Sequence, residues 1–267
     1  MRTGDARVRE AQARLDGLAR PASGHPASGG YGSRLRRLGL RTAEVRAVAR
    51  ELARQCRTLP PRAVVAVGLG LVRRGTLEGG LVACELLSRH RAASASLTAR
   101  DLERLARDPD NWVTTDSFAC LLSGPAWHGG RIGDEVVERW ARSPNRWWRR
   151  IALVSTVPLN LPSRGGTGDV PRTLRLCGRL VADRDDMVVK AMSWALREAA
   201  KRDPLAVRRF LARHGRALAP RVVREVTNKL ATGLKDPGRS RRGIRRAAGA
   251  VAVRASLRGR AGAGARP

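Results

Sequence analysis

Apolar positions recur with helical spacing from about residue 41 to residue 234, and short polar breaks interrupt the pattern. Pro61, Pro171, Pro204 and Pro220 stand at the beginnings of such stretches, where a proline can start a helix without losing a needed backbone donor. Alternation of β-branched residues is almost absent, which argues against strands. The chain is therefore predicted to be all-α, with helices over Thr42–Cys56, Pro61–Arg73, Leu77–Arg91, Thr98–Arg107, Trp112–Leu122, Gly133–Arg142, Arg146–Val157, Pro171–Val181, Met187–Lys201, Pro204–Arg213 and Pro220–Thr232.

Three of the predicted helices open in the same way. Asn145 and Asp185 each begin a helix and are followed five residues later by a basic side chain, Arg150 or Lys190, and then by apolar residues. Asp110 precedes an earlier helix in a similar register, so the three starts are 35 and 40 residues apart. This pattern resembles the inner helix of a HEAT repeat. We therefore expect an all-α, HEAT-like helical-repeat solenoid with a concave basic groove; an ordinary helical bundle is the alternative.

Composition divides the chain into three parts. Residues 1–33 mix charge with Pro, Gly and Ser and are predicted to be a disordered basic arm, whereas residues 34–235 form the helical domain. Within that domain, Asn160–Gly168 is predicted to be a loop between helix pairs. Residues 236–267 carry nine arginines against one acid and are predicted to be an Arg-rich, disordered tail.

The charge balance indicates a polyanionic partner. Lys and Arg together number 53 against 23 acids, which gives a formal net charge of +30 and favours nucleic acid as the partner. A membrane partner is not expected, because no stretch approaches the ~20 apolar residues of a spanning helix and the first residues lack the apolar core of a signal peptide. The four cysteines are widely spaced, so we expect them to be small buried residues in a cytoplasmic protein, without a metal site.

The strongest candidate for chemistry is the helix that starts near Trp112. Trp112 and Asp116 are four residues apart and so share one helix face, while Phe118 and Leu122 point away from it into packing. An exposed indole one turn from a carboxylate suits a cationic ligand. A packed ring beside a solvated acid is the structural explanation for the same spacing.

Two later helices are expected to bring cations and another indole to the same surface. The candidate side chains are Arg146, Arg149, Arg150, Lys190, Trp194, Arg197 and Lys201. Cations neutralise phosphates while ring faces pack on sugars or bases, so this set suits a nucleic-acid backbone. Trp147 and Trp148 are adjacent and cannot both face this surface, so one of them is expected in the core.

Motifs at these positions recur in a known family. They are the Lys-Ala-x-x-Trp-x-Leu-Arg-Glu-x-x-Lys-x-x-Pro core of Met187–Pro204, Trp112-x-x-x-Asp116-Ser117, Asn145-x-Trp147-x-x-Arg150 and Leu38-Gly39-Leu40-Arg41-Thr42. With them the chain resembles the DNA alkylation repair glycosylases of the AlkD-like, HEAT-repeat type, from about Arg37 to Leu230.

The resemblance implies an enzyme that removes alkylated purines from double-stranded DNA. It implies Asp116 as the catalytic carboxylate, and Trp112 and Trp194 as side chains that cradle the backbone of the damaged nucleotide. Arg150, or its neighbour Arg149, is implied as the anchor of a nearby phosphate. No cofactor is expected, and the protein is expected to be a monomer.

The chemistry of such lesions agrees with these roles. A purine alkylated at N3 or N7 is already cationic, so its glycosidic bond breaks with a neutral leaving group and needs no general acid. A carboxylate can stabilise the oxocarbenium-like sugar and position water. No Lys stands beside Asp116 to act as an amine nucleophile, so we expect hydrolysis without a covalent sugar intermediate. A non-catalytic HEAT-repeat module that binds DNA or RNA, and a scaffold for acidic proteins, are the alternatives.

Overall fold

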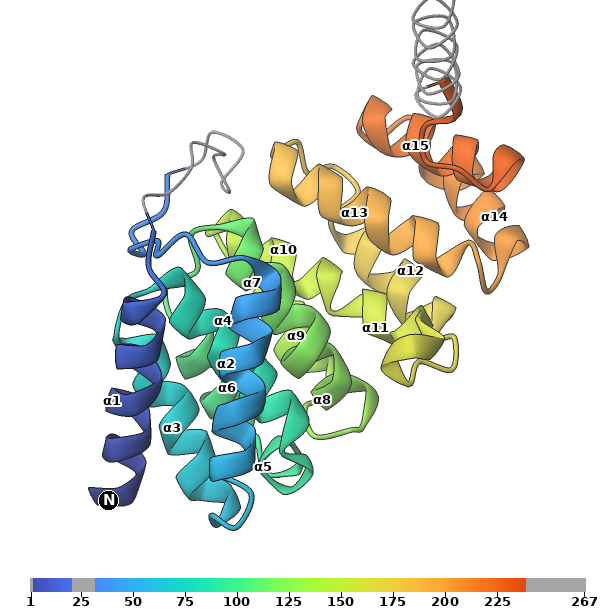
Figure 1. Ribbon diagram of the computed structural model, residues 1–267. Helices are drawn as coiled ribbons and strands as arrows, with labels where there is room; N and C mark the ends of the chain where they lie inside the picture. The colour runs from blue at the N-terminus through green and yellow to red at the C-terminus, as the bar shows by residue number, and fades with distance from the viewer. Residues whose placement is uncertain (1, 21–31, 239–267) are drawn as a thin grey trace, which may run out of the picture.

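The computed structural model describes residues 2–20 and 32–238, and helices make up most of this part of the chain (Figure 1). No strand forms among these residues, in which one isolated parallel bridge joins Arg36 to Thr76. The helices pack against one another in two rows. The predicted all-α, helical-repeat fold is thus confirmed.

The first row contains helices that contact one another in chain order. It consists of α2 (Thr42–Gln55), α4 (Leu77–Arg89), α7 (Trp112–Phe118), α10 (Arg146–Val154), α13 (Asp186–Ala199) and α15 (Pro220–Thr232). The second row covers it and consists of α1 (Arg2–Gly17), α3 (Pro61–Arg73), α5 (Arg91–Ala95), α6 (Ala99–Leu105), α8 (Gly124–His128), α9 (Asp134–Ala141), α11 (Thr156–Asn160), α12 (Val170–Arg179) and α14 (Pro204–His214).

Two predicted helices are divided where the chain turns. The helix predicted over Leu77–Arg91 ends at Arg89, because His90 adopts an extended backbone and its Nδ1 accepts a hydrogen bond from the N–H of Ala93 (3.1 Å), which starts α5. The helix predicted over Arg146–Val157 ends at Val154, and α11 follows at once. Pro158 explains this second break, because a proline within a helix removes one backbone donor and crowds the preceding turn.

The prediction of a disordered arm is wrong for its first half, which forms α1. Val8, Ala11 and Leu15 recur with helical spacing and are buried where α1 packs on α3. Val8 lies so close to Gly70 that a Cβ on residue 70 would come within 2.6 Å of Val8 Cγ2. The many charges on the other faces of α1 hide this apolar stripe in the sequence. The rest of the predicted arm at residues 21–31, and the predicted tail from residue 239 onward, lie outside the described residues.

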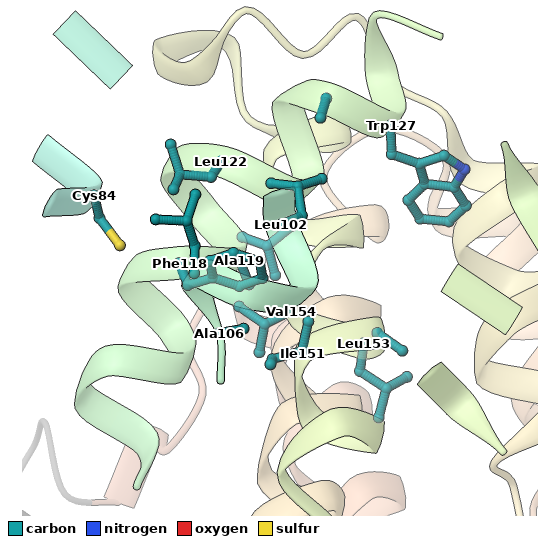
Figure 2. Close-up of a cluster of buried hydrophobic side chains, with 14 of the residues drawn as sticks. Cys84, Leu102, Ala106, Phe118, Ala119, Leu122, Trp127, Ile151, Leu153 and Val154 are labelled. Atoms are coloured by element: carbon teal, nitrogen blue, oxygen red, sulfur yellow. The ribbon is translucent and has the colours of Figure 1, made fainter. Parts of the chain in front are cut away.

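Buried apolar side chains form one continuous core. Figure 2 shows part of it, around Phe118, Leu122 and Ile151. Phe118 and Leu122 belong to it, which confirms that they point away from the face that carries Asp116. Trp147 is buried as well, while Trp148 is half-buried against Trp140 with ring centroids 5.3 Å apart. One of the two adjacent indoles therefore lies in the core, as predicted.

The cysteines are largely buried, as the sequence predicts. Cys56, Cys84 and Cys177 are buried and Cys120 is half-buried. Burial raises the pKa of the Cys84 and Cys177 thiols to about 12, so both are protonated at neutral pH. Within the described residues, no group of three or more His, Cys, Asp or Glu side chains is placed to hold a metal ion. No described helix is long and apolar enough to cross a membrane.

Candidate active site

Three polar residues begin the helices that carry the candidate site. Asn111, Asn145 and Asp185 are the N-caps of α7, α10 and α13, and each side chain accepts a hydrogen bond from a backbone N–H of the first turn (2.9–3.0 Å). Such caps satisfy donors that a helix start would otherwise leave free. Asp110, which precedes α7 in the sequence, instead accepts hydrogen bonds from Ser33 and from the backbone of Arg34.

The same caps tie neighbouring helix starts to one another. Asn145 Nδ2 donates to the carbonyl of Pro109 (3.3 Å), and Arg146 donates to the Asp185 carboxylate (3.1 Å). Arg34, Arg146 and Arg149 line a hollow of about 540 Å³ at these starts. The aligned starts thus place the first turns of α7, α10 and α13 side by side.

At the centre of this arrangement, Arg150 and Asp116 form a bidentate ion pair. Arg150 Nε donates to Asp116 Oδ1 (2.8 Å) and Nη2 to Oδ2 (2.7 Å). The remaining nitrogen, Nη1, donates to the backbone carbonyl of Met187 in α13 (2.6 Å). Only 6% of Arg150 is exposed. A phosphate could therefore reach this guanidinium only by displacing Asp116 or the Met187 carbonyl.

The protonation of Asp116 depends on two opposing effects. Burial raises the pKa of its carboxyl above the ordinary value of 3.8, whereas the hydrogen bonds and the charge of Arg150 lower it. Two charge-assisted bonds from Arg150 favour the ionised form against this effect of burial. The charge of the ionised form acts in a poorly hydrated place, where interactions with a nearby cation are stronger than in water.

The two candidate indoles differ in exposure. Trp112 is 38% exposed and stands one helical turn before Asp116. Trp194 is half-buried and packs partly against the core from α13, the helix that Arg150 contacts through Met187. Both lie on the row of helices that carries the Asp116–Arg150 pair.

The cations predicted to contact phosphate have partners within the chain. Arg146 pairs with Asp185 (3.1 Å), Arg149 with Asp183 (2.7 Å), Lys190 with Asp186 (2.7 Å) and Lys201 with Glu198 (2.6 Å). Arg197 is half-buried and its Nε donates to Ser193 Oγ (3.3 Å). Arg146, Lys190 and Lys201 are 39–45% exposed, and because exposed ion pairs contribute only about 0–1 kcal/mol, a phosphate can compete for these three side chains. Arg149 is 20% exposed and also donates to the carbonyls of Ser143 and Pro144, so it is held more firmly.

A π-helical turn, Ala119–Ser123, follows α7 where the sequence predicts continuous helix to Leu122. The N–H of Gly124 bonds to the carbonyl of Ala119, five residues back. Pro125 explains the wider turn, because its ring would clash with the carbonyl of Leu121 in a regular α-helix. A glycine is required beside it, because a Cβ on residue 124 would lie 2.7 Å from the carbonyl oxygen of Ser155.

One cation near the site is absent from the sequence-based candidates. Arg164 is exposed in the short 3-10 turn Pro162–Arg164, within the loop that the sequence predicts. Burial raises the pKa of the Cys120 thiol to about 12, the charge of Asp116 adds to this effect, and the charge of Arg164 opposes it. Arg164 therefore lies within electrostatic reach of a residue one turn after Asp116. A loop position has no helical register, so no spacing in the sequence indicates this proximity.

Comparisons with known proteins agree with this architecture. The model of a family described as DNA alkylation repair enzyme matches residues 11–230, so the match begins within α1. A solved structure described as "Predicted DNA alkylation repair enzyme from Enterococcus faecalis" is similar with a TM-score of 0.61 and 17% identity, over 74% of this chain and 90% of that chain. At this identity the likeness shows a shared fold alone. No curated protein matches the chain. Because the family match covers most of its length, the chain belongs to the DNA alkylation repair enzyme family.

Proposed function

We propose that the protein is a DNA glycosylase that excises cationic N3- or N7-alkylated purines from duplex DNA by hydrolysis of the N-glycosidic bond. The observation that carries this proposal is the Asp116 carboxylate, which Arg150 holds at both oxygens one helical turn from the exposed indole of Trp112. Family membership supports a role in the repair of alkylation damage. The net charge of +30 supports DNA as the partner.

Asp116 is the catalytic residue in this proposal. The cationic base leaves as a neutral purine, and the sugar becomes oxocarbenium-like. The fixed carboxylate stabilises that charge and accepts the proton that the attacking water loses as its oxygen bonds to the sugar carbon. Arg150 is a positioning residue rather than a phosphate anchor, because its nitrogens are already engaged by Asp116 and Met187. No cofactor takes part in this step.

The surrounding side chains bind the DNA backbone. Trp112 and Trp194 offer ring faces to the sugars beside the lesion. The cations proposed to contact phosphates are Arg146, Arg149, Lys190, Arg197 and Lys201, and Arg164 joins them. The protein is proposed to act as a monomer.

The chemistry predicts selectivity for lesions that carry a positive charge. Discrimination comes from the lability of the lesion, so 7-methylguanine and 3-methyladenine should be released. Uracil and 8-oxoguanine are neutral and should be retained. Duplexes with a single lesion, followed by chromatography of the released base under single-turnover conditions, test this directly. Efficient release of uracil without release of 7-methylguanine would overturn the proposal.

The role of Asp116 is tested by Asp116→Asn, which keeps the shape and removes the charge. We expect excision to fall at least 100-fold while duplex binding persists. Asp134→Asn is a matched control, because Asp134 also pairs with arginines but lies at the start of α9 in the second row. Excision at the wild-type rate by Asp116→Asn would show that another group carries the chemistry.

One observation favours a second candidate function. A buried bidentate ion pair can have a purely structural role, in which it joins α7 to α10 and takes no part in chemistry. In that case the protein is a non-catalytic DNA-binding module. Such a module would bind alkylated and undamaged duplexes equally and release no base from either, so the same lesion panel separates the two functions.

A further inference from the structure

A strongly cationic hollow lies at the C-terminal ends of α2 and α4, away from the candidate active site. It measures about 660 Å³ and is lined by Arg50, Ala53, Arg54, Arg57, Arg89, His90 and Arg91. No acidic residue is among these lining residues. Like charges gathered at one surface repel one another, so this arrangement is unfavourable unless an anion binds between them.

Two of these arginines have structural partners and three do not. Arg54 pairs with Glu51, and Arg89 pairs with Glu85 (2.8 Å). Arg50, Arg57 and Arg91 are exposed, and their side chains make no hydrogen bond or ion pair with any other described residue.

Stabilisation of helix ends explains only part of the cluster. A basic side chain in the last turn of a helix interacts favourably with the helix dipole, and Arg54 and Arg89 occupy such positions. Arg50 precedes the last turn of α2, and Arg91 is the first residue of α5, where a positive charge is unfavourable. The charge of these two residues therefore needs another explanation.

The hollow belongs to the same row of helices as Asp116. Arg46 of α2 pairs with Glu85 of α4 (3.4 Å) at the exposed surface between these helices. Ser117 of α7, the residue after Asp116, lies close enough to Cys84 of α4 to lower the pKa of its thiol against the effect of burial. α2, α4 and α7 are thus consecutive helices of the first row.

The separation between the hollow and Asp116 follows from the geometry of packed helices and can be compared with the spacing of phosphates in DNA. Neighbouring helices pack about 8–10 Å apart, so the midpoint between α2 and α4 lies about 15 Å from α7 across the row. The hollow also lies about two turns, or about 11 Å, further along the helix axes than Asp116. The two displacements give a separation of about 20 Å, so phosphates at the hollow belong to base pairs that flank the lesion and not to the damaged nucleotide itself.

We propose that this hollow binds backbone phosphates of the same duplex, about 20 Å from the damaged nucleotide on one side of the lesion. The inference rests on the proposed function for its register, because the lesion at Asp116 fixes which phosphates reach α2 and α4. Arg50, Arg57 and Arg91 make the contacts. The hollow adds phosphate contacts on one side of the lesion and makes no base-specific contact.

Equilibrium binding to a fluorescein-labelled, undamaged 24-base-pair duplex tests the contact itself. The full chain with Arg50→Gln, Arg57→Gln and Arg91→Gln should bind at least 10-fold more weakly. The slope of log K against log salt should become shallower by about 2–3, since each lost phosphate contact contributes about 0.9. The matched control is Arg100→Gln, Arg209→Gln and Arg213→Gln, three exposed arginines of α6 and α14 in the second row. It should change binding less than 2-fold.

A lysine triple at the same three positions should restore the slope, because an ammonium also binds phosphate. Equal weakening by the two glutamine triples, or an unchanged slope, would overturn the proposal. This arm uses undamaged DNA, so it gives an answer even if the protein excises nothing.

The register is tested with 7-methylguanine duplexes in an Asp116→Asn background. One duplex has twelve base pairs on each side of the lesion, and a hairpin-closed duplex has four. The glutamine triple should weaken binding to the long duplex and leave binding to the short one unchanged. Equal weakening on both would place the contacted phosphates next to the lesion and refute the assigned distance.

Discussion

Arg150 holds both carboxylate oxygens of Asp116 while its third nitrogen bonds to the backbone of Met187. One guanidinium thereby fixes the relative positions of α7, α10 and α13. The position and the charge of Asp116 consequently depend on a residue that need not touch substrate. Stability, excision and pH dependence should therefore all respond to changes at Arg150.

Arg150→Gln should lower both stability and excision, because it leaves the Asp116 carboxylate buried without its partner. Breaking one side of a buried ion pair costs about 3–5 kcal/mol in the free energy of unfolding. Chemical denaturation measures this loss. The double variant Asp116→Asn/Arg150→Gln should recover part of the stability and none of the excision. Additive losses in the double variant would show that the two side chains are not coupled.

Excision should decline at a higher pH than an ordinary aspartate would impose. Burial raises the pKa of Asp116 above 3.8, and only the ionised carboxylate stabilises the sugar cation. The rate is complete well above the raised pKa and is lost as the pH falls through it. Arg150→Gln should move this decline to still higher pH, because it removes the effect that opposes burial. Single-turnover rates between pH 4 and 8, with folding followed by circular dichroism, provide the measurement; a flat profile would contradict the assignment.

Asp101→Asn should lower stability at neutral pH but not near pH 2. Hydrogen bonds from Arg62 (2.7 and 2.9 Å) lower the pKa of Asp101 to about 2, against the opposing effect of burial. A carboxyl with a depressed pKa stabilises the fold above its unfolded value near 3.8, and this contribution is lost as the pH falls to about 2. After allowance for the exposure of Arg62, we expect a loss of about 1–2 kcal/mol at pH 7.

The control for this variant is Asp108→Asn, since Asp108 and its partner Arg107 are both exposed. Urea unfolding of both variants and the wild type at pH 7 and pH 2.5 makes the comparison. A constant difference between Asp101→Asn and the wild type at both pH values would mean that the ion pair is not its cause.

Leu15→Ala should destabilise the protein strongly, because α1 is part of the core. Leu15 is 0% exposed, and truncation of a buried leucine costs about 2–5 kcal/mol. Arg14→Ala, at an exposed position of the same helix, should change stability by less than about 0.5 kcal/mol. Denaturation midpoints of the two variants decide this. A small loss in the free energy of unfolding for Leu15→Ala would mean that α1 contributes little to the stability of the core.

Local signals in the sequence predict many elements of the fold. Pro61 and Pro220 mark helices whose observed bounds equal the predicted ones. The caps Asn145 and Asp185 predict where α10 and α13 begin, because a cap acts within one turn of its own residue. The four-residue spacing likewise places Trp112 and Asp116 on one face of α7.

Contacts between distant residues could not be predicted in the same way. Arg150 lies 34 residues after Asp116, and their pairing depends on how α7 and α10 pack. The sequence therefore suggests Arg150 as a phosphate ligand, whereas the packing turns it toward the carboxylate. The burial of Val8 could not be predicted for a second reason. Arginines and acids surround the apolar positions of its helix in the sequence, and only the packed structure reveals its contact with Gly70.

The π-helical turn after α7 separates two orientations of one helical segment. Each residue advances an α-helix by about 100°, so one extra residue in a turn rotates everything after it by that amount. Before the turn, Asp116 faces α10; after it, Trp127 is buried and its indole N–H donates to Asp134 (2.8 Å). The turn thus shifts the helical register, so that Asp116 can face α10 while Trp127 stays in the core. Deletion of one residue there would rotate these two side chains relative to each other by about 100°.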